Sequence, residues 1–219
     1  MRKKIIILGG IGNGSVIASA IVDANQRGAR EWEFAGYLND RLEAGARIET
    51  FPVMGKLDDW VKFADDGCFF INTIFRIDGQ QERIDRFEAL DIPNERLATF
   101  VHPMAYVASS ARLGSGTVVM PLAAISAATI TGKGCLVMVG AKILHNTKIG
   151  KYCHFAAQCC VGANMNVGDG VHIGLNACTR ENLSIGKNAT LGMGSVLTKD
   201  MGGGEIWAGN PARFLRRAK

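Results

Sequence analysis

The sequence predicts an α/β N-terminal domain, with a small Rossmann-like parallel sheet in residues 1–100, followed by a parallel β-helix of hexapeptide repeats in residues 101–219. Two observations predict this fold class. An apolar residue recurs at every sixth position through the second half of the chain, and the first half alternates short apolar runs with helical segments around a glycine-rich loop. A period of six fits neither an α-helix nor a simple strand, whereas short repeats with glycine are typical of β-solenoids.

The repeat runs from Val101 to Leu197 without a break in register. Fifteen of its seventeen sixth positions are aliphatic or Phe, the other two are Thr, and the residue four places later is mostly small. Three hexapeptides then form one coil of a triangular prism, with both positions pointing inward and successive coils about 4.8 Å apart. Glycine follows the sixth position eight times, and we expect it to relieve the backbone where the chain turns with φ near or above zero.

The first hundred residues predict strands at residues 4–9, 34–38 and 68–73. Helices are expected at 13–27 and 78–90, and a further helix is expected to begin within residues 53–59. Strands that alternate with helices form a parallel α/β sheet. The chain is expected to cross into the prism near residues 97–101, with a structural His102 in the joint.

The composition, 47% hydrophobic and 21% charged, is that of an ordinary soluble globular protein. Cys135, Cys153 and Cys159 fall on the small inward position, so they are expected to fill the core. Without a CxxC pair or a signal peptide, the six cysteines indicate a cytoplasmic location. No stretch approaches about 18 apolar residues, so no membrane span is expected.

Charge is divided unevenly along the chain. Residues 1–100 hold 13 basic and 16 acidic residues, a net of −3, and residues 101–219 hold 12 and 4, a net of +8. A basic prism suits a polyanionic ligand, and it equally suits plain solubility. Nucleic acid is not expected as a partner, because the basic residues are scattered and not interleaved with aromatic ones.

The loop at residues 9–14, GGIGNG, predicts a strand-to-helix turn that could hold a phosphate. A nicotinamide cofactor fits poorly, because Ser15 stands where the third glycine of a GxGxxG motif belongs and Asp40 comes about 30 residues on instead of about 20. A nucleotide or sugar phosphate on the helix N-terminus fits better, since its backbone N–H groups favour anions.

The order of these parts resembles one family. The prism opens on HPMAYVASSARLGSG and the chain ends near IWAGNPAR. With the glycine loop and the long hexapeptide array, these segments resemble the sugar acetyltransferases that include sialic-acid O-acetyltransferases and the N-acetyltransferases acting on nucleotide-linked 4-amino sugars. The resemblance spans nearly the whole chain. It implies a left-handed β-helix, a homotrimer, a nucleotide sugar held by the N-terminal domain, and acetyl-CoA bound between neighbouring prisms.

The resemblance implies a catalytic base at His145. The stretch LHNTKIG, residues 144–150, matches the family's pattern of a His, three residues and an Ile-Gly corner. Acyl transfer from a thioester requires removal of a proton from the attacking group, and imidazole is suited to this near neutral pH. The family commonly has Glu after the base, whereas this chain has Asn146. Its amide can fix the ring tautomer but supplies no charge, so a weaker base is expected.

Other site residues are carried over by position. The substrate is expected to face Ile11, Gly12, Asn13, Asn39 and Asp40. Acetyl-CoA is expected to contact His154 near its thioester, the backbone N–H of Ala163, Leu175, Met193 and, at the adenine end, Pro211. The basic tail (Arg213, Arg216, Arg217 and Lys219) is expected either to meet CoA phosphates or to be solvated.

Several alternatives stay open. His154 and His172 are 18 residues apart and so lie on one prism face, but zinc needs three or more convergent ligands. No metal is therefore expected, and His172 is expected at the surface. A non-catalytic or degenerate homologue that binds nucleotide sugar or CoA, a sialic-acid O-acetyltransferase, and a nicotinamide-dependent enzyme are the alternatives to an N-acetyltransferase. The sequence leaves the sugar, the nucleotide and the choice between N- and O-acetylation undetermined.

Overall fold

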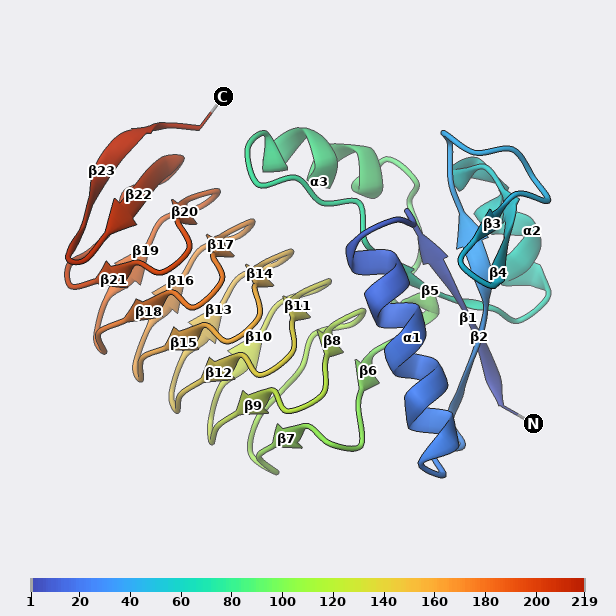
Figure 1. The fold of residues 1–219 in the computed structure, drawn as a ribbon, viewed down its shortest axis with the longest axis horizontal. Coiled ribbons are helices and arrows are strands. Elements are labelled where there is room, and N and C mark those ends of the chain that lie inside the picture. Colours follow the sequence, from blue (N-terminus) through green and yellow to red (C-terminus); the bar gives the residue numbers. More distant parts are fainter. Residues whose placement is uncertain (1, 219) are drawn as a thin grey trace.

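A computed structural model describes residues 2–218. It consists of an α/β domain and a triangular prism that lie side by side, with the α/β domain packed against the first coils of the prism (Figure 1). The C-terminal hairpin closes the far end of the prism. The predicted fold class is confirmed in both parts.

The N-terminal domain contains one five-stranded sheet in the order β3-β4-β2-β1-β5. Its parallel strands are β1 (Lys3–Leu8), β2 (Trp32–Leu38), β4 (Phe51–Gly55) and β5 (Phe69–Asn72), and β3 (Arg47–Ile48) is antiparallel to β4. Three of these strands were predicted. The helix expected to begin within residues 53–59 is present, because helical structure begins at Leu57, whereas residues 53–55 before it belong to β4, a strand that was not predicted. Pro52 is compatible with this strand, because β4 pairs with β2 only after the proline and has only the two residues of β3 on its other side.

The helices cover both faces of this sheet. They are α1 (Asn13–Gln26), the short η1 (Leu57–Asp59), α2 (Trp60–Asp65), α3 (Gln80–Glu88) and η2 (Asn94–Arg96). One face packs with α1 against the prism, where Ile5 and Ile17 join Met120 and Leu136 in a single apolar cluster. The other face packs against α2 and α3. The two parts of the chain thus share a hydrophobic core.

The prism has three faces, each a parallel sheet. Face 1 contains β6 (Phe100–Val101), β8 (Val118–Val119), β11 (Leu136–Val137), β14 (His154–Phe155), β17 (His172–Ile173), β20 (Thr190–Leu191), β22 (Glu205–Gly209) and the antiparallel β23 (Ala212–Arg217). Face 2 contains β7 (Tyr106–Val107), β9 (Ala124–Ile125), β12 (Lys142–Ile143), β15 (Cys160–Val161), β18 (Cys178–Thr179) and β21 (Val196–Leu197). Face 3 contains β10 (Ile130–Thr131), β13 (Lys148–Ile149), β16 (Asn166–Val167) and β19 (Ser184–Ile185). Each strand pairs with the strand one coil, or 18 residues, away, as His154 pairs with His172.

The predicted inward positions form the prism core. From Val119 to Leu197, most of the sixth positions are buried, and so are the small residues four places later, including Cys135, Cys153 and Cys159. The first coil is less well covered, since Val101 is exposed and Val107 and Leu113 are only half-buried. The cysteines of the core are therefore packing residues, as expected.

The expected role of glycine in the turns is wrong. The residue with positive φ comes three places after the sixth position, where five residues are Asn, five are Gly, and the other four are Leu122, Ala128, Tyr152 and Gln158. Glycine directly after the sixth position has another cause. A Cβ on Gly132 would come within 2.7 Å of the backbone of Gly150 in the next coil, and a Cβ on Gly162 equally close to Arg180. The residue three places after the sixth position therefore needs a backbone with positive φ. The residue directly after the sixth position needs the space between coils that only glycine leaves.

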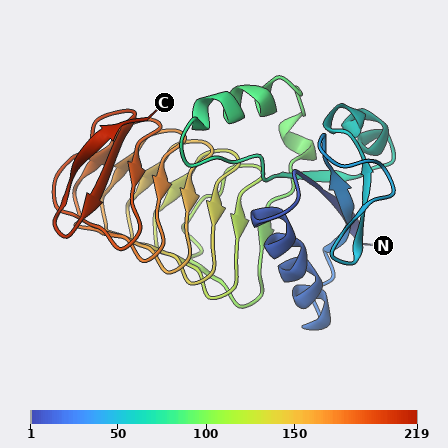
Figure 2. The ribbon, with the colours of Figure 1, turned by 45° about the horizontal axis from the view of Figure 1, so that its top comes forward.

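A segment from β5 to α3 fastens the N-terminal domain along face 1 (Figure 2). Asp78 forms an ion pair with Arg216, N–O distance 3.0 Å, and Gln81 accepts a hydrogen bond from Asn188 at 2.9 Å. We call residues 74–79 the strap. In the joint, His102 is fully buried with its Nε2 3.0 Å from the Asp23 carboxylate, which agrees with a structural role. No helix within residues 2–218 is long and apolar enough to cross a membrane.

The spacing of coils at Gly132 can be tested by adding a single methyl group. We expect Gly132→Ala to destabilise the protein by about 1–3 kcal/mol, because the new Cβ collides with the backbone of the next coil. Gly194→Asn is the control: Gly194 has φ +65 and open space around it, and Asn occupies the equivalent turn one coil below. Thermal unfolding measures both. Equal melting temperatures for the two variants would contradict this account.

Candidate active site

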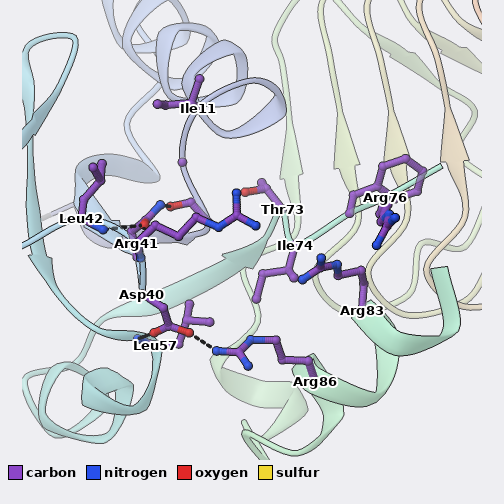
Figure 3. Close-up of a pocket in the computed structure, with 14 residues that line it drawn as sticks. Ile11, Asp40, Arg41, Leu42, Leu57, Thr73, Ile74, Arg76, Arg83 and Arg86 are labelled. Atoms are coloured by element: carbon purple, nitrogen blue, oxygen red, sulfur yellow. Dashed lines mark hydrogen bonds and ion pairs between the residues drawn. The ribbon is translucent and has the colours of Figure 1, made fainter. Parts of the chain in front are cut away.

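A pocket of about 850 Å³ opens at the carboxyl ends of the central strands β1, β2 and β5 (Figure 3). Ligands of open parallel sheets bind at this edge. The residues that line it come from the glycine loop, the segments after β2 and β5, and α3 (Gly9, Gly10, Ile11, Asn39, Asp40, Arg41, Leu42, Leu57, Thr73, Ile74, Phe75, Arg76, Arg83 and Arg86).

The glycine loop is shaped by close packing at its base. A Cβ on Gly9 would lie 2.5 Å from the Thr73 hydroxyl, and one on Gly10 would lie 2.5 Å from Ile48. Gly12 has φ +94 and begins α1 with no side-chain cap, and the first turn of α1 carries no acidic residue. Ile11, at the tip, is 82% exposed. The loop therefore presents an uncapped helix N-terminus beside the pocket, which is favourable to an anion.

Asn39 and Asp40, both predicted from the sequence, build the pocket wall. Asn39 donates to the Gly9 carbonyl at 2.8 Å and accepts from the backbone N–H of Arg41 at 2.8 Å. Asp40 accepts from the Leu57 N–H at 3.0 Å and forms an ion pair with Arg86. The Asn39 amide and the Asp40 carboxylate thus tie the loop after β2 to the glycine loop, to η1 and to α3.

Four arginines surround the pocket, and sequence reasoning missed all of them. Arg86 pairs with Asp40, and Arg76 lies 4.0 Å from Glu82. Arg41 and Arg83 form no ion pair with a carboxylate among the described residues. Their side chains extend toward the pocket from opposite walls (Figure 3). The spacing of Arg83 and Arg86, three residues apart on one helix, was the available signal.

The predicted substrate residues separate into two groups. Ile11, Asn39 and Asp40 line the pocket, whereas Gly12 and Asn13 do not. Asn13 turns toward the prism, where its amide nitrogen lies 3.2 Å from Nε2 of His154. Asn13 therefore links the glycine loop to face 1.

His154 and His172 form a buried pair on face 1. Their Nδ1 atoms are 2.9 Å apart, and the rings are stacked 5.0 Å apart at an angle of 9°. Phe75 from the strap covers both rings, at 4.4 and 5.5 Å. Burial lowers the pKa of His154 to about 3, with a smaller contribution from His172, and burial lowers the pKa of His172 to about 4. The expected surface position of His172 is wrong, because the strap lies over it. Its exposed fraction is only 6%.

His145 and Asn146 lie on the edge between faces 2 and 3, just after β12. Both are exposed, and the Asn146 amide nitrogen is 3.1 Å from Nδ1 of His145. The two side chains lie side by side, but the amide presents its nitrogen to the ring, where an accepting oxygen was expected. Asn146 also has φ +57, so it occupies the turn position of its coil.

The predicted CoA residues lie on two different edges. Ala163 is directly one coil above His145, since the Asn164 N–H donates to the His145 carbonyl at 2.9 Å. Leu175 and Met193 are stacked one coil apart on the edge between faces 1 and 2, and they are 51% and 77% exposed. Pro211 is exposed at the tip of the hairpin, after a cis peptide bond. All of face 2 separates His145 from Leu175 and Met193, so one chain does not bring them together.

Comparisons with known proteins show what the chain is similar to. Residues 128–163 match the sequence profile described as "Bacterial transferase hexapeptide (six repeats)". The acetyltransferase domain of PglB from Neisseria gonorrhoeae FA1090 in complex with acetyl coenzyme A is 26% identical, with a TM-score of 0.83 over 98% of this chain and 100% of that one.

Two further solved structures share the fold. GDP-perosamine N-acetyl transferase from Caulobacter crescentus, an H141A mutant with CoA and GDP-perosamine, has a TM-score of 0.82 at 22% identity over 97% of each chain. WeeI from Acinetobacter baumannii AYE has a TM-score of 0.80 at 23% identity over 97% of this chain and 100% of that one. No curated protein matches the chain by sequence. The predicted resemblance to hexapeptide-repeat sugar acetyltransferases is confirmed, and the comparisons support the predicted enzyme class, an acyltransferase with acetyl-CoA as cosubstrate.

Two smaller expectations concern metals and the tail. Within residues 2–218, no group of three or more His, Cys, Asp or Glu residues could hold a metal ion. In the tail, Arg216 pairs with Asp78, and Arg217 lies 4.0 Å from Glu205. Lys219 lies outside the described residues. Two of the basic side chains are thus engaged with the protein itself.

The buried histidines predict how stability depends on pH. Their folded pKa values lie below the unfolded value of about 6.5, so the unfolded chain binds more protons below that pH. We therefore expect the free energy of unfolding to fall as pH drops from about 6.5 toward 5, by roughly 1 kcal/mol per pH unit for each histidine. Urea unfolding at several pH values measures the slope. His172→Phe should reduce it and His145→Gln should not, and an unchanged slope in His172→Phe would contradict the assignment.

Proposed function

We propose that this protein is an acetyl-CoA-dependent acetyltransferase that acetylates an amino group of a nucleotide-linked sugar, with His145 as general base and a site shared between neighbouring subunits of a homotrimer. The observation that carries the proposal is the match, over nearly the full length of both chains, to an acetyltransferase domain bound to acetyl coenzyme A. The geometry of the pocket and of the two prism edges supports it.

The pocket supports a nucleotide sugar as the acceptor. Arg41 and Arg83 carry two positive charges without carboxylate partners among the described residues, beside the uncapped N-terminus of α1. A diphosphate supplies two negative charges and planar oxygen pairs that guanidinium groups bind well. The structural relative bound to GDP-perosamine carries such a diphosphate, and this supports the same substrate class here.

The proposed chemistry is attack of the sugar amine on the thioester carbonyl carbon. A nitrogen–carbon bond forms, the carbon–sulfur bond breaks, and His145 takes the amine proton and returns it to the departing thiolate of CoA. The backbone N–H of Ala163, one coil above His145, is the candidate donor to the oxyanion of the tetrahedral intermediate. Its place fits this role because Ala163 lies directly above the base.

The tautomer of His145 depends on how Asn146 presents its amide. With its oxygen toward Nδ1, the amide accepts a hydrogen bond from the Nδ1–H group and leaves the lone pair of Nε2 free to act as a base. With its nitrogen toward Nδ1, as in the present arrangement, it donates and places the ring proton on Nε2. Activity therefore requires the amide to turn over, whereas a carboxylate accepts in both orientations.

A second copy of the chain supplies the missing contact. His145 and Ala163 lie on the edge between faces 2 and 3, and Leu175 and Met193 lie on the edge between faces 1 and 2. Bringing one edge against the other requires two chains, and a threefold arrangement closes this head-to-tail contact. Apolar side chains exposed on these edges and on face 2 suit such a contact (Tyr106, Leu122, Leu144, Leu175 and Met193).

Mixed trimers of two inactive variants test both the base and the shared site. One variant is His145→Ala and the other carries Arg41→Gln with Arg83→Gln, and release of thiol from acetyl-CoA is measured with GDP-perosamine and UDP-linked 4-amino sugars. Each variant alone should be inactive. After co-expression, random mixing should restore up to about a quarter of the wild-type rate. In one quarter of the sites, the pocket comes from a chain with intact arginines and the base comes from a neighbouring chain with an intact His145. No recovery would show that the site lies within one chain, and full activity of His145→Ala would remove its role as base.

The same assay tests Asn146. Asp tolerates the positive φ of this turn better than Glu, so Asn146→Asp is the suitable change. We expect a higher rate, because the carboxylate fixes the productive tautomer and strengthens the base. Asn164→Asp, at the same turn one coil above, is the control and should leave the rate unchanged. An unchanged rate in Asn146→Asp would mean that the amide already supports the base fully.

Calorimetric titration with GDP and UDP tests the anion-binding pocket separately from catalysis. We expect Arg83→Gln to weaken nucleoside diphosphate binding by about tenfold or more, because a charge-assisted hydrogen bond is lost. Arg30→Gln, an exposed change before β2 at the opposite end of the sheet, should leave the affinity unchanged. If the Arg83 variant and the wild type bind with equal affinity, the diphosphate does not bind in this pocket.

A second candidate function follows from the amide orientation at Asn146. If the amide keeps donating to Nδ1, His145 has no lone pair on Nε2 and the protein binds nucleotide sugar and acetyl-CoA without turnover. Binding of both ligands with no thiol release for any amino or hydroxyl acceptor, sialic acid included, would favour this binding role. Release of thiol with sialic acid alone would instead identify an O-acetyltransferase.

A further inference from the structure

His154 and His172 form a buried pair that has no role in the proposed chemistry at His145. Each ring is only 6% exposed, and the two are stacked under Phe75, which also lines the substrate pocket. Asn13, three residues after the pocket residue Gly10, closes the other side of His154. The pair therefore lies where the glycine loop, the pocket and face 1 meet.

The distances allow the protons of the two rings to be placed. An Nδ1–Nδ1 distance of 2.9 Å is a hydrogen bond, so one ring donates and the other accepts. The Asn13 amide nitrogen, 3.2 Å from Nε2 of His154, can only donate, so this Nε2 holds a lone pair. The proton of His154 is then on Nδ1, and it is donated to Nδ1 of His172. His172 consequently carries its own proton on Nε2.

Burial keeps this pattern in place. Both rings stay neutral near pH 7, because burial lowers the pKa of each far below that pH. A protonated His154 would carry hydrogens on both nitrogens and would confront the Asn13 donor. The pair thus holds a single arrangement of protons, with one acceptor atom, Nε2 of His154, directed at the glycine loop.

We propose that His172 is a positioning residue that fixes His154 in its Nδ1–H tautomer, so that Nε2 of His154 accepts a hydrogen bond from the nucleophilic amino group of the acceptor sugar. This inference rests on the proposed function, since it assigns a contact within the same site. The Asn13 amide, an N–H donor, occupies the place that the sugar amine takes when the substrate is bound.

The chemistry of the two substrates supports the amine over the thioester as the partner. A thioester carbonyl oxygen is an acceptor, and it would face a lone pair at Nε2. A neutral amine is a donor there, and its own lone pair stays free for attack. The assignment therefore changes the expected role of His154, from a contact of acetyl-CoA to an orienting group for the nucleophile.

Long-range ¹H–¹⁵N NMR of the histidine rings tests the tautomers directly and needs no turnover. With four histidines in the chain, single substitutions assign the signals. At pH 7 we expect a protonated Nδ1 and bare Nε2 in His154, and the reverse in His172. A protonated Nε2 in His154, or a doubly protonated ring in either residue, would overturn the proposal. If the tautomers are as expected but no acetyl transfer occurs, the assigned arrangement of protons stands, and the proposed function fails together with the contact to the sugar amine that depends on it.

Variants of His172 test the consequence for the acceptor. His172→Phe keeps an aromatic ring under Phe75 but removes the acceptor atom, and we expect the KM for the amino sugar to rise about tenfold with the KM for acetyl-CoA unchanged. His172→Gln, which can accept from Nδ1–H, should recover part of the loss. Leu136→Val, in the same row one coil below His154, is the control for packing alone. If His172→Phe behaves like this control, or His172→Gln is as impaired as His172→Phe, the positioning role is wrong.

Discussion

The structure depends on one constraint, the close approach of backbone to backbone between successive coils of the prism. Because a coil is always 18 residues, chemically related positions are stacked in columns, such as His154 under His172 and Leu175 under Met193. Glycine follows the sixth position wherever a Cβ would meet the next coil, as at Gly132 and Gly162. This spacing decides which edge each functional side chain occupies. It thereby separates His145 from Leu175 and Met193 by a full face.

That separation explains why the proposed site requires both the N-terminal domain and a second chain. The pocket with Arg41 and Arg83 is held against face 1 by the strap and by the apolar contacts around α1. His145 faces away from it, on the edge between faces 2 and 3. A rigid prism cannot fold to bring these groups together, so the proposed function requires that two chains associate to complete the site. In that proposal, the exposed apolar residues on the edges are contact residues between chains.

The sequence predicted the side-chain positions that follow from the register of the repeat. It missed those that depend on contacts between segments far apart in the chain. The period of six placed the core residues, including the cysteines, and put His145 on an exposed edge, because each follows from the register alone. Arg83 lies on a helix whose distance from Asp40 is set by tertiary packing, so the spacing of Arg83 and Arg86 could place them on one helix face but could not show that this face lines a pocket. His172 was expected at the surface, because its burial comes from the strap, far away in sequence. The resemblance suggested Asn13 as a substrate residue, yet the folded chain turns it toward His154.

Asn146 shows how a structural requirement and a catalytic one can meet at one residue. Its φ of +57 is repeated at Asn164, Asn176, Asn182 and Asn188, each in the same turn position of its hexapeptide. Asn tolerates this conformation better than Glu does, so the backbone alone is a sufficient reason for an amide beside His145. The missing carboxylate is therefore not by itself a sign of lost activity. For the proposed base, the deciding question is whether the amide accepts a hydrogen bond from the ring, and this is set by local hydrogen bonding and not by the turn.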